Sequence, residues 1–292
     1  KIIDGTGNNW YYGNVAVKDG KIVKAGRAIL DSAASVIIDA TGLVVAPGFI
    51  DVHTHIEDNE AKDPTAANFI YDGVTTVVTG NCGESNTDIG KYLSWLHSLR
   101  LSVNVATLIG HNDVRKAVMG LANRDATPQE MLQMEAMVNK AMQDGAVGLS
   151  TGLIYIPGTY TKTPEIIALA KIVSKYGGVY ATHIRDEGDS VVSAINEAIA
   201  IGREAGIPVE ISHFKLSGQQ NWGRSKETIQ MVKTAREQGI EVTIDQYPYT
   251  ASSTSISTLL PDEILADGQD SIRARLQNEA IKKDVVAYML KR

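Results

Sequence analysis

From Leu43 onward the sequence alternates short apolar runs with longer amphipathic stretches, and this alternation restricts the possible folds more than any other feature. Such alternation is typical of βα units, which place their strands in a parallel sheet covered by helices. Seven runs are expected to form strands: 44–52, 75–79, 102–109, 146–151, 179–183, 208–213 and 241–247. The sequence therefore predicts an α/β fold of the (β/α)8 TIM-barrel type, with seven of the eight strands present.

Helix signals separate these runs. Thr127 and Pro128 precede Glu130, an N-cap pattern that predicts a helix ending near Gly145, and Thr163-Pro164-Glu165 to Gly177 repeats it. A third helix is expected over 225–239. A stripe at helical spacing is interpreted as a packing face: Met131, Met134, Val138 and Met142.

The two ends of the chain lack this alternation of strand and helix signals. Residues 1–45 contain short apolar runs with turn residues, including an Asp19-Gly20 hairpin signal and a strand expected over 35–39. We expect them to form the N-terminal part of a small β-sandwich domain, and residues 46–292 to form the barrel. Residues 252–292 are expected to be a mainly helical excursion with no further strand, so the barrel is expected to be truncated before strand eight.

Charge and composition exclude some functions. The net charge of −6 comes without any basic run, which argues against a nucleic-acid partner. No apolar stretch reaches the roughly 18 residues that a membrane helix needs. The single cysteine, Cys82, excludes an internal disulfide and is compatible with a reducing compartment. Cytoplasm is therefore the default expectation, although a signal peptide before Lys1 would be compatible with the sequence; the oligomeric state is not indicated.

Metal-ligating residue types stand at the ends of the predicted strands. His53 and His55 close the first run, and residues two apart on a strand point to the same side. Cys82, His183 and His213 each follow a later strand. Because reactive groups of barrel enzymes lie at the carboxyl ends of the strands, these five are expected to converge. Imidazole and thiolate suit Zn²⁺, and an open zinc site predicts metal-assisted hydrolysis.

Two cations follow two of these histidines. Arg185 and Lys215 each come two positions after a histidine and are expected on the metal side, where they would suit a substrate carboxylate. The alternatives are that Arg185 pairs with Asp186 or Glu187 and that Lys215 faces solvent.

Three residues allow further interpretations. Cys82 could act as a nucleophile, although no basic partner is indicated for it. His111 either binds a ligand or is structural, and His97, on a predicted helix, is interpreted as structural.

The segment Pro47-Gly48-Phe49-Ile50-Asp51-Val52-His53-Thr54-His55 resembles the signature of the amidohydrolase superfamily, metal-dependent barrel hydrolases with an attached β-sandwich. Three further segments resemble the N-acyl-D-amino-acid deacylase (D-aminoacylase) branch: 80–83, 182–187 and 212–215. This resemblance extends from residues 3–7 through residues 245–249. The predicted fourth strand carries neither the Lys nor the Glu that bridges metals in many superfamily members.

The resemblance implies zinc-dependent hydrolysis of the amide bond of N-acyl-D-amino acids. It implies that Cys82, His183 and His213 hold a tightly bound zinc, and that His53 and His55 form a weaker or partly occupied second site. It also implies that Tyr155 polarises the scissile carbonyl and that Lys215 holds the α-carboxylate. The implied general acid/base is an Asp after strand eight, which is not in this sequence, so little turnover is expected from the 292 residues alone.

Two alternatives are kept. One is a cyclic amidase of the hydantoinase or dihydropyrimidinase type, against which the missing strand-four Lys argues. The other is a non-catalytic metal-binding scaffold, although structural zinc sites more often draw four ligands from local, cysteine-rich sequence. The preferred acyl group and side chain are not indicated.

Overall fold

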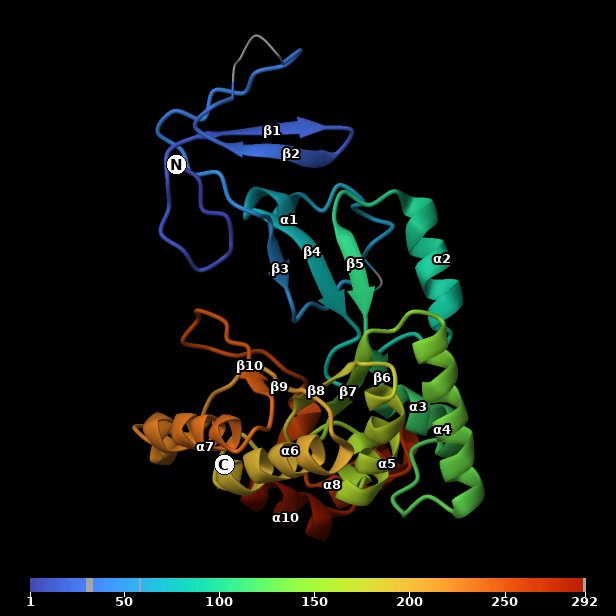
Figure 1. The fold of residues 1–292 in the computed structure, drawn as a ribbon. Coiled ribbons are helices and arrows are strands. Elements are labelled where there is room, and N and C mark those ends of the chain that lie inside the picture. The colour runs from blue at the N-terminus through green and yellow to red at the C-terminus, as the bar shows by residue number, and fades with distance from the viewer. Residues whose placement is uncertain (30–33, 58, 291–292) are drawn as a thin grey trace.

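The computed structural model describes residues 1–29, 34–57 and 59–290. Its centre consists of parallel strands whose order in space follows their order in the chain (Figure 1). A three-stranded sheet contains β3 (Phe49–Asp51), β4 (Val74–Thr79) and β5 (Asn104–Thr107). A five-stranded sheet contains β6 (Ile109–Gly110), β7 (Gly148–Gly152), β8 (Val179–His183), β9 (Val209–Ile211) and β10 (Val242–Ile244). The prediction of an α/β fold with parallel strands is confirmed.

The third predicted strand is divided in two. It was expected to run without interruption, but it splits at Leu108 into β5 and β6, which belong to different sheets. Backbone bonds still join the two sheets there: the Leu108 N–H donates to the Thr79 carbonyl at 2.9 Å, and the Val147 N–H donates to the Thr107 carbonyl at 2.9 Å. The strand order therefore continues from β4 to β7 across the break.

Helices follow the strands around their outer side (Figure 1). The helices between strands are α1 (Ala67–Tyr71), α2 (Ile89–Leu99), α3 (His111–Met119), α4 (Pro128–Gln143), α5 (Thr163–Ser174), α6 (Val191–Ala205) and α7 (Ser225–Glu237), with 3₁₀ turns η2 (Gly158–Tyr160) and η3 (Gln219–Asn221). The buried faces of α2 to α7 pack against β6 to β10 in an apolar core that includes Leu149, Ile195 and Val209. A second, smaller cluster lies around β4 and contains Ala66, Val77 and Val103. The two clusters hold the carboxyl ends of the strands in fixed relative positions.

The predicted start signals of two helices have different outcomes. At α4 the capping box is present, since Thr127 Oγ accepts from the Glu130 N–H at 3.3 Å and the Glu130 carboxylate accepts from the Thr127 N–H at 2.8 Å. At α5 the expected cap by Thr163 is wrong. The helix begins one residue earlier than predicted, with Lys162 at the N-cap, so Thr163 is the first helical residue and its hydroxyl donates to Glu197 at 2.8 Å.

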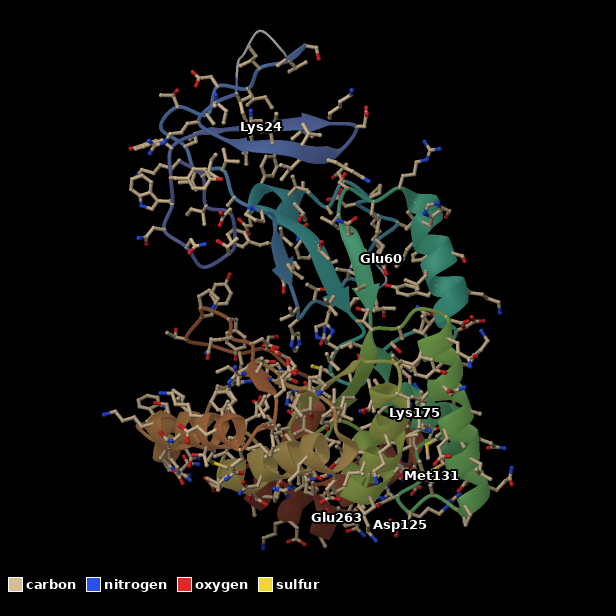
Figure 2. The ribbon with its side chains drawn as sticks, viewed as in Figure 1. Lys24, Glu60, Asp125, Met131, Lys175 and Glu263 are labelled. Carbon is tan, nitrogen blue, oxygen red and sulfur yellow. The ribbon has the colours of Figure 1, made fainter. Side chains whose placement is uncertain are left out.

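The methionine stripe of α4 is a packing face, as predicted. Met134 and Val138 are completely buried, Met142 is nearly so, and Met131 packs against the same core at its edge (Figure 2).

The N-terminal region contains one antiparallel hairpin, β1 (Asn14–Lys18) and β2 (Lys21–Gly26), at one end of the molecule (Figure 1). Asp19 and Gly20 form its turn with positive φ angles, as predicted. The strand expected over 35–39 is wrong: these residues form no strand, and Val36, Ile37 and Ile38 are exposed because none of the described strands pairs with them. The isolated bridges of Ile2 to Tyr11 and Val45 tie this region together.

Residues after β10 are helical and contain no strand up to residue 290, as expected. They form η4 (Ile256–Leu259), α8 (Asp262–Leu265), α9 (Gln269–Leu276) and α10 (Glu279–Met289). Among the described residues, no helix has the length and apolar character needed to cross a membrane.

Candidate metal centre

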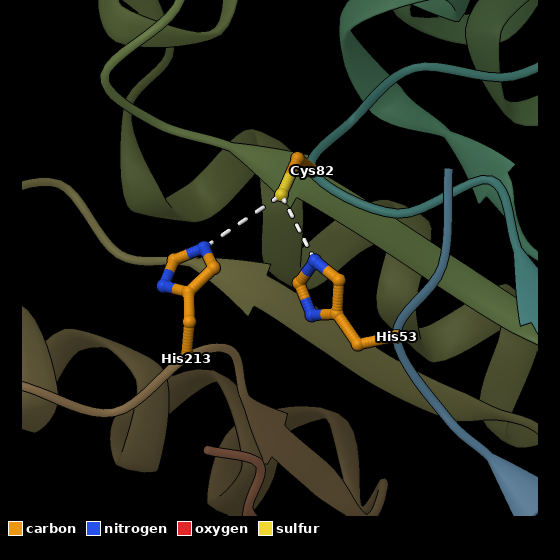
Figure 3. A group of neighbouring side chains, drawn as sticks. All are labelled: His53, Cys82 and His213. Atoms are coloured by element: carbon orange, nitrogen blue, oxygen red, sulfur yellow. Dashed lines mark hydrogen bonds between the residues drawn. The ribbon is translucent and has the colours of Figure 1, made fainter. Parts of the chain in front are cut away.

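Four of the predicted ligands meet at the carboxyl ends of the parallel strands. His53 follows β3, Cys82 lies in the turn after β4, His183 ends β8 and His213 follows β9. Cys82 Sγ lies 3.5 Å from His53 Nε2, 3.9 Å from His183 Nδ1 and 3.8 Å from His213 Nε2. Figure 3 shows the sulfur facing the rings of His53 and His213. Segments that are far apart in sequence, such as those of Cys82 and His213, which are separated by 131 residues, therefore bring one thiol and three imidazoles together.

These separations fit ligands that share one metal ion. Zinc takes sulfur at about 2.3 Å and imidazole nitrogen at about 2.0–2.1 Å in tetrahedral geometry, which places the two donor atoms roughly 3.5 Å apart. Two groups of residues have ligand atoms within 4.8 Å of one another: His53, Cys82 and His213 form one, and His183, Glu187 and His213 form the other. His213 belongs to both, so the groups form one continuous cluster.

Two of the ligand residues adopt unusual backbone conformations. Cys82 has φ of 55° and His213 has φ of 39°, in the left-handed region that residues with a Cβ rarely occupy. Next to Cys82, a Cβ on Gly83 would lie 2.2 Å from Asn112 Oδ1, so only glycine fits there. Such strain clusters at functional sites, because surrounding contacts must hold it in place.

Two carboxylates orient the histidines. His53 Nδ1 lies 2.9 Å from Asp245 Oδ2, and His213 Nδ1 lies 2.8 Å from Glu187 Oε1. In metal sites the ring nitrogen that is not bound to the metal commonly donates to a carboxylate, which fixes the tautomer. Sequence reasoning did not assign either carboxylate to the site. The only signals were that Glu187 lies four residues after His183 and that Asp245 lies near the end of the predicted strand 241–247.

Burial sets the ionisation of these groups. Burial, together with the nearby Asp245 carboxylate, raises the pKa of the Cys82 thiol to about 12. Burial also lowers the pKa of His183 to about 3, which keeps its imidazole neutral and able to bind a metal. Glu187 behaves oppositely: burial opposes its ionisation, but the hydrogen bond from His213 and the nearby positive charges lower its pKa to about 2. A bound cation would favour the thiolate, since coordination deprotonates a thiol.

His55 lies beside this cluster and outside both ligand groups. Its ring centroid is 5.4 Å from that of His53, although both residues lie beyond the end of β3. Burial and the charge of His53 lower the pKa of His55. It is therefore available as a ligand at the edge of the cluster.

Tyr155 and Lys215 both reach the ligands. Tyr155 OH lies 3.5 Å from His183 Nδ1 and 2.9 Å from Thr254 Oγ1. Lys215 Nζ lies 2.9 Å from His213 Nδ1 and 2.6 Å from Glu187 Oε1, so it faces the metal side and not the solvent. A phenol and an ammonium group thus flank the cluster.

Arg185 does not reach the metal ligands, and the expectation that it binds substrate is corrected. Its guanidinium forms a paired contact with Glu197, at 3.0 Å for each oxygen, and donates to the carbonyls of Thr159 and Thr161. Its partner is also neither Asp186 nor Glu187. The strand ends at His183, so the period of two used to place Arg185 does not extend to it.

The remaining two histidines are not part of the cluster. His111 is completely buried at the start of α3, and its Nε2 lies 2.9 Å from Glu165 Oε1, a contact within the core. His97 lies on α2, among the leucines next to β5.

The fold and the cluster define a parallel α/β protein with a candidate metal centre at its strand ends. Comparisons with known proteins show which proteins it is similar to. Residues 36–171 match the model of the amidohydrolase family. D-aminoacylase of Alcaligenes xylosoxydans xylosoxydans is 38% identical to 93% of this chain, which covers 60% of that protein. Over residues 36–171 the chain is therefore similar to the amidohydrolase family, and over most of its length it is similar to D-aminoacylase.

Two solved structures extend this comparison. A D-aminoacylase structure, described by its binuclear metal centre with one-metal activation and second-metal attenuation, matches 89% of the chain with a TM-score of 0.82 and 38% identity. N-acyl-D-glutamate deacylase of Bordetella bronchiseptica, complexed with zinc and a phosphonate mimic of the reaction's tetrahedral intermediate, matches 85% with a TM-score of 0.76 and 36% identity. The chain covers 60% and 57% of these two structures, respectively. It therefore spans about 60% of the length of its relatives.

Proposed function

We propose that this chain carries the metal centre of a zinc-dependent hydrolase that cleaves the amide bond of N-acyl-D-amino acids to a carboxylate and a free D-amino acid. The observation that carries the proposal is the position of Cys82 Sγ, 3.5–3.9 Å from three histidines that come from separate strand ends. The similarity to D-aminoacylase and to N-acyl-D-glutamate deacylase supports the reaction and the substrate class.

The fold supports a corresponding proposal for the architecture. The seven predicted strands, counting β5 and β6 as one, follow one another in parallel from β3 to β10, as strands one to seven of a (β/α)8 barrel do. Residues 46–292 would form this barrel, and residues 1–45 would contribute to a small β-sandwich domain.

Cys82, His183 and His213 would hold the tightly bound zinc, and His53 with His55 would provide the second, weaker site. The donor set fits zinc because thiolate and imidazole are its preferred ligands, and because the strand-end location leaves coordination positions open. Zinc bound there would polarise the substrate carbonyl and lower the pKa of a water molecule to about 7.

The protein's own residues would orient the substrate. Lys215 Nζ would bind the α-carboxylate, for which it would exchange its contact with Glu187. Burial raises the pKa of Tyr155 to about 12, so its phenol stays protonated at neutral pH and can donate a hydrogen bond to the carbonyl oxygen as negative charge develops there. No described residue is assigned the proton transfer to the leaving amine.

Enantiomer-selective binding tests this proposal without requiring turnover. Phosphonate analogues of an N-acyl-D-amino acid and of its L enantiomer would be titrated into the zinc-loaded protein by calorimetry. We expect the D analogue to bind at least tenfold more tightly, and Lys215→Met to weaken it, because the substitution removes the carboxylate contact. Equal binding of both enantiomers would contradict the assignment.

The two alternatives give different results in the same protein. Ring opening of hydantoin or dihydropyrimidine, without cleavage of linear amides, would identify a cyclic amidase. Stoichiometric zinc that binds neither phosphonate and opens no ring would identify a non-catalytic metal-binding scaffold.

A further inference from the structure

The loop that carries Tyr155 is fastened to the rest of the molecule at both of its ends. It covers residues 152–162, between β7 and α5, and includes the turn η2. Its Leu153 N–H donates to the His183 carbonyl at 3.0 Å, so the loop starts against the strand that carries a metal ligand. The distance of Tyr155 OH from His183 therefore depends on how the rest of the loop is held.

Arg185 fastens the far end of the loop. Its Nη1 donates to the Thr159 carbonyl at 3.0 Å and its Nη2 donates to the Thr161 carbonyl at 2.9 Å. Glu197 of α6 fixes the guanidinium through two contacts of 3.0 Å and also accepts from Thr163, the first residue of α5. A planar guanidinium can make these contacts at the same time, which an ammonium group cannot.

Asn112 fastens the near end. Its side chain is almost completely buried, donates to the Gly152 carbonyl at 2.9 Å and accepts from the Gly152 N–H at 3.2 Å. A Cβ on Gly158 would lie 2.6 Å from Asn112 Oδ1, so the loop packs closely over this amide. Gly83, next to the metal ligand Cys82, packs on the other side of the same amide.

We propose that Arg185 and Asn112 are positioning residues that hold the hydroxyl of Tyr155 next to His183 through the 152–162 loop. The inference deepens the proposed function, since it assigns how the carbonyl-polarising group is held. Neither residue touches the substrate in this scheme. A displacement of the phenol would weaken its hydrogen bond to the reacting oxygen, and a misplacement of about 1 Å can cost roughly 100-fold in rate.

The position of Tyr155 can be observed directly by ¹⁹F NMR. The eleven tyrosines would be replaced biosynthetically by 3-fluorotyrosine in the full chain, and the Tyr155 resonance would be assigned with Tyr155→Phe. We expect Arg185→Gln and Asn112→Ala to shift or broaden that resonance while zinc content and the Co²⁺ absorption spectrum stay unchanged. Arg185→Lys keeps the positive charge but removes the planar guanidinium, so it should change the Tyr155 resonance to an intermediate extent. The matched control is Arg203→Gln, at an exposed arginine on α6, which should leave all resonances in place.

Activity provides the second test. If the zinc-loaded protein cleaves N-acyl-D-amino acids, Arg185→Gln should lower kcat about 10- to 100-fold and add no further loss to Tyr155→Phe, because both changes remove the same hydrogen bond. Independent, multiplicative losses would overturn the proposal, as would an unmoved Tyr155 resonance or equal disturbance of all tyrosines. Because the NMR measurement needs no substrate, equal binding of the D and L phosphonates together with the expected resonance changes would overturn the proposed function alone.

Discussion

His53 and Asp245 are 192 residues apart in sequence, and their side chains join the carboxyl ends of β3 and β10, the first and last parallel strands described. The imidazole Nδ1 lies 2.9 Å from Asp245 Oδ2, while Nε2 of the same ring faces Cys82 Sγ at 3.5 Å. In the proposed metal-bound form Nε2 would present its lone pair to the metal, so Nδ1 would carry the proton and donate a hydrogen bond to Asp245. Asp245 also accepts from the backbone N–H of His213, so one carboxylate orients ligands from two strands.

Asp245→Asn should therefore weaken metal binding without removing a ligand. The amide cannot accept as strongly from His53 and His213, and loss of such a supporting partner commonly costs about 10- to 100-fold in metal affinity. Zinc affinity would be measured by competition with a chromogenic chelator. Asp270→Asn is the matched control, because that carboxylate is almost fully exposed and distant in the fold. Unchanged affinity in Asp245→Asn would show that the carboxylate does not orient the site.

Cys82→Ser should have a larger effect than Asp245→Asn. The substitution replaces the soft sulfur donor at the centre of the histidine cluster with a hydroxyl, which is a poor zinc ligand at neutral pH. We expect zinc affinity to fall by more than about 100-fold, and the thiolate-to-metal charge-transfer absorption of the Co²⁺ form to disappear. Retention of that absorption in the serine protein would show that sulfur is not a ligand.

The sequence predicted that these candidate ligands converge, for a simple physical reason. Parallel strands end at the same edge of a sheet, so Cys82, His183 and His213 had to approach one another once their strands were correctly assigned. The capping box at Thr127 and Glu130 was equally readable, because both of its partners lie within one helical turn.

The side-chain contacts beyond the strand ends could not be predicted from hydrophobic periodicity or from the spacing of residues. Alternation placed Arg185 beside His183, but β8 ends at His183 and the following backbone turns the guanidinium toward Glu197. Asp245 and Glu187 were missed as supporting groups, because a contact between separate strand ends depends on the curvature of the sheet. The split at Leu108 was likewise not predictable, because an apolar run of residues does not encode where the chain leaves one sheet and enters the next.

Arg115→Met should strongly destabilise the fold. Arg115 is completely buried on α3, where its Nη1 donates to Glu165 at 2.6 Å and its Nη2 to the Arg124 carbonyl at 2.6 Å. Burial opposes the ionisation of Glu165, but the hydrogen bonds and charges of His111 and Arg115 outweigh it and lower the pKa of Glu165. Removing the cation leaves a buried carboxylate less compensated, which typically costs about 3–5 kcal/mol in the free energy of unfolding.

Urea denaturation monitored by circular dichroism would measure that cost. Arg273→Met is its control, because Arg273 is largely exposed and lies 3.6 Å from an exposed Asp270, so its loss should change stability by less than about 1 kcal/mol. Equal stability of the two variants would exclude an energetic role for the buried pair.

Tyr180 should make the protein less stable at alkaline pH. Its side chain is completely buried in β8, its hydroxyl lies 2.9 Å from Thr151 Oγ1, and burial raises its pKa to about 12. The folded state therefore favours the neutral phenol more than the unfolded state does, where the pKa is about 10. The resulting stabilisation is complete below pH 10 and is lost as pH rises from about 10 through 12.

Tyr180→Phe should be less stable than the native chain at pH 8, by about 1 kcal/mol for the lost hydrogen bond. Because phenylalanine does not ionise, the stabilities of the two proteins should converge above pH 10 in urea titrations, whereas Tyr71→Phe, at an almost fully exposed tyrosine, should follow the native chain at every pH. Parallel curves for Tyr180→Phe and the native chain would show that the Tyr180 phenol does not control alkaline stability.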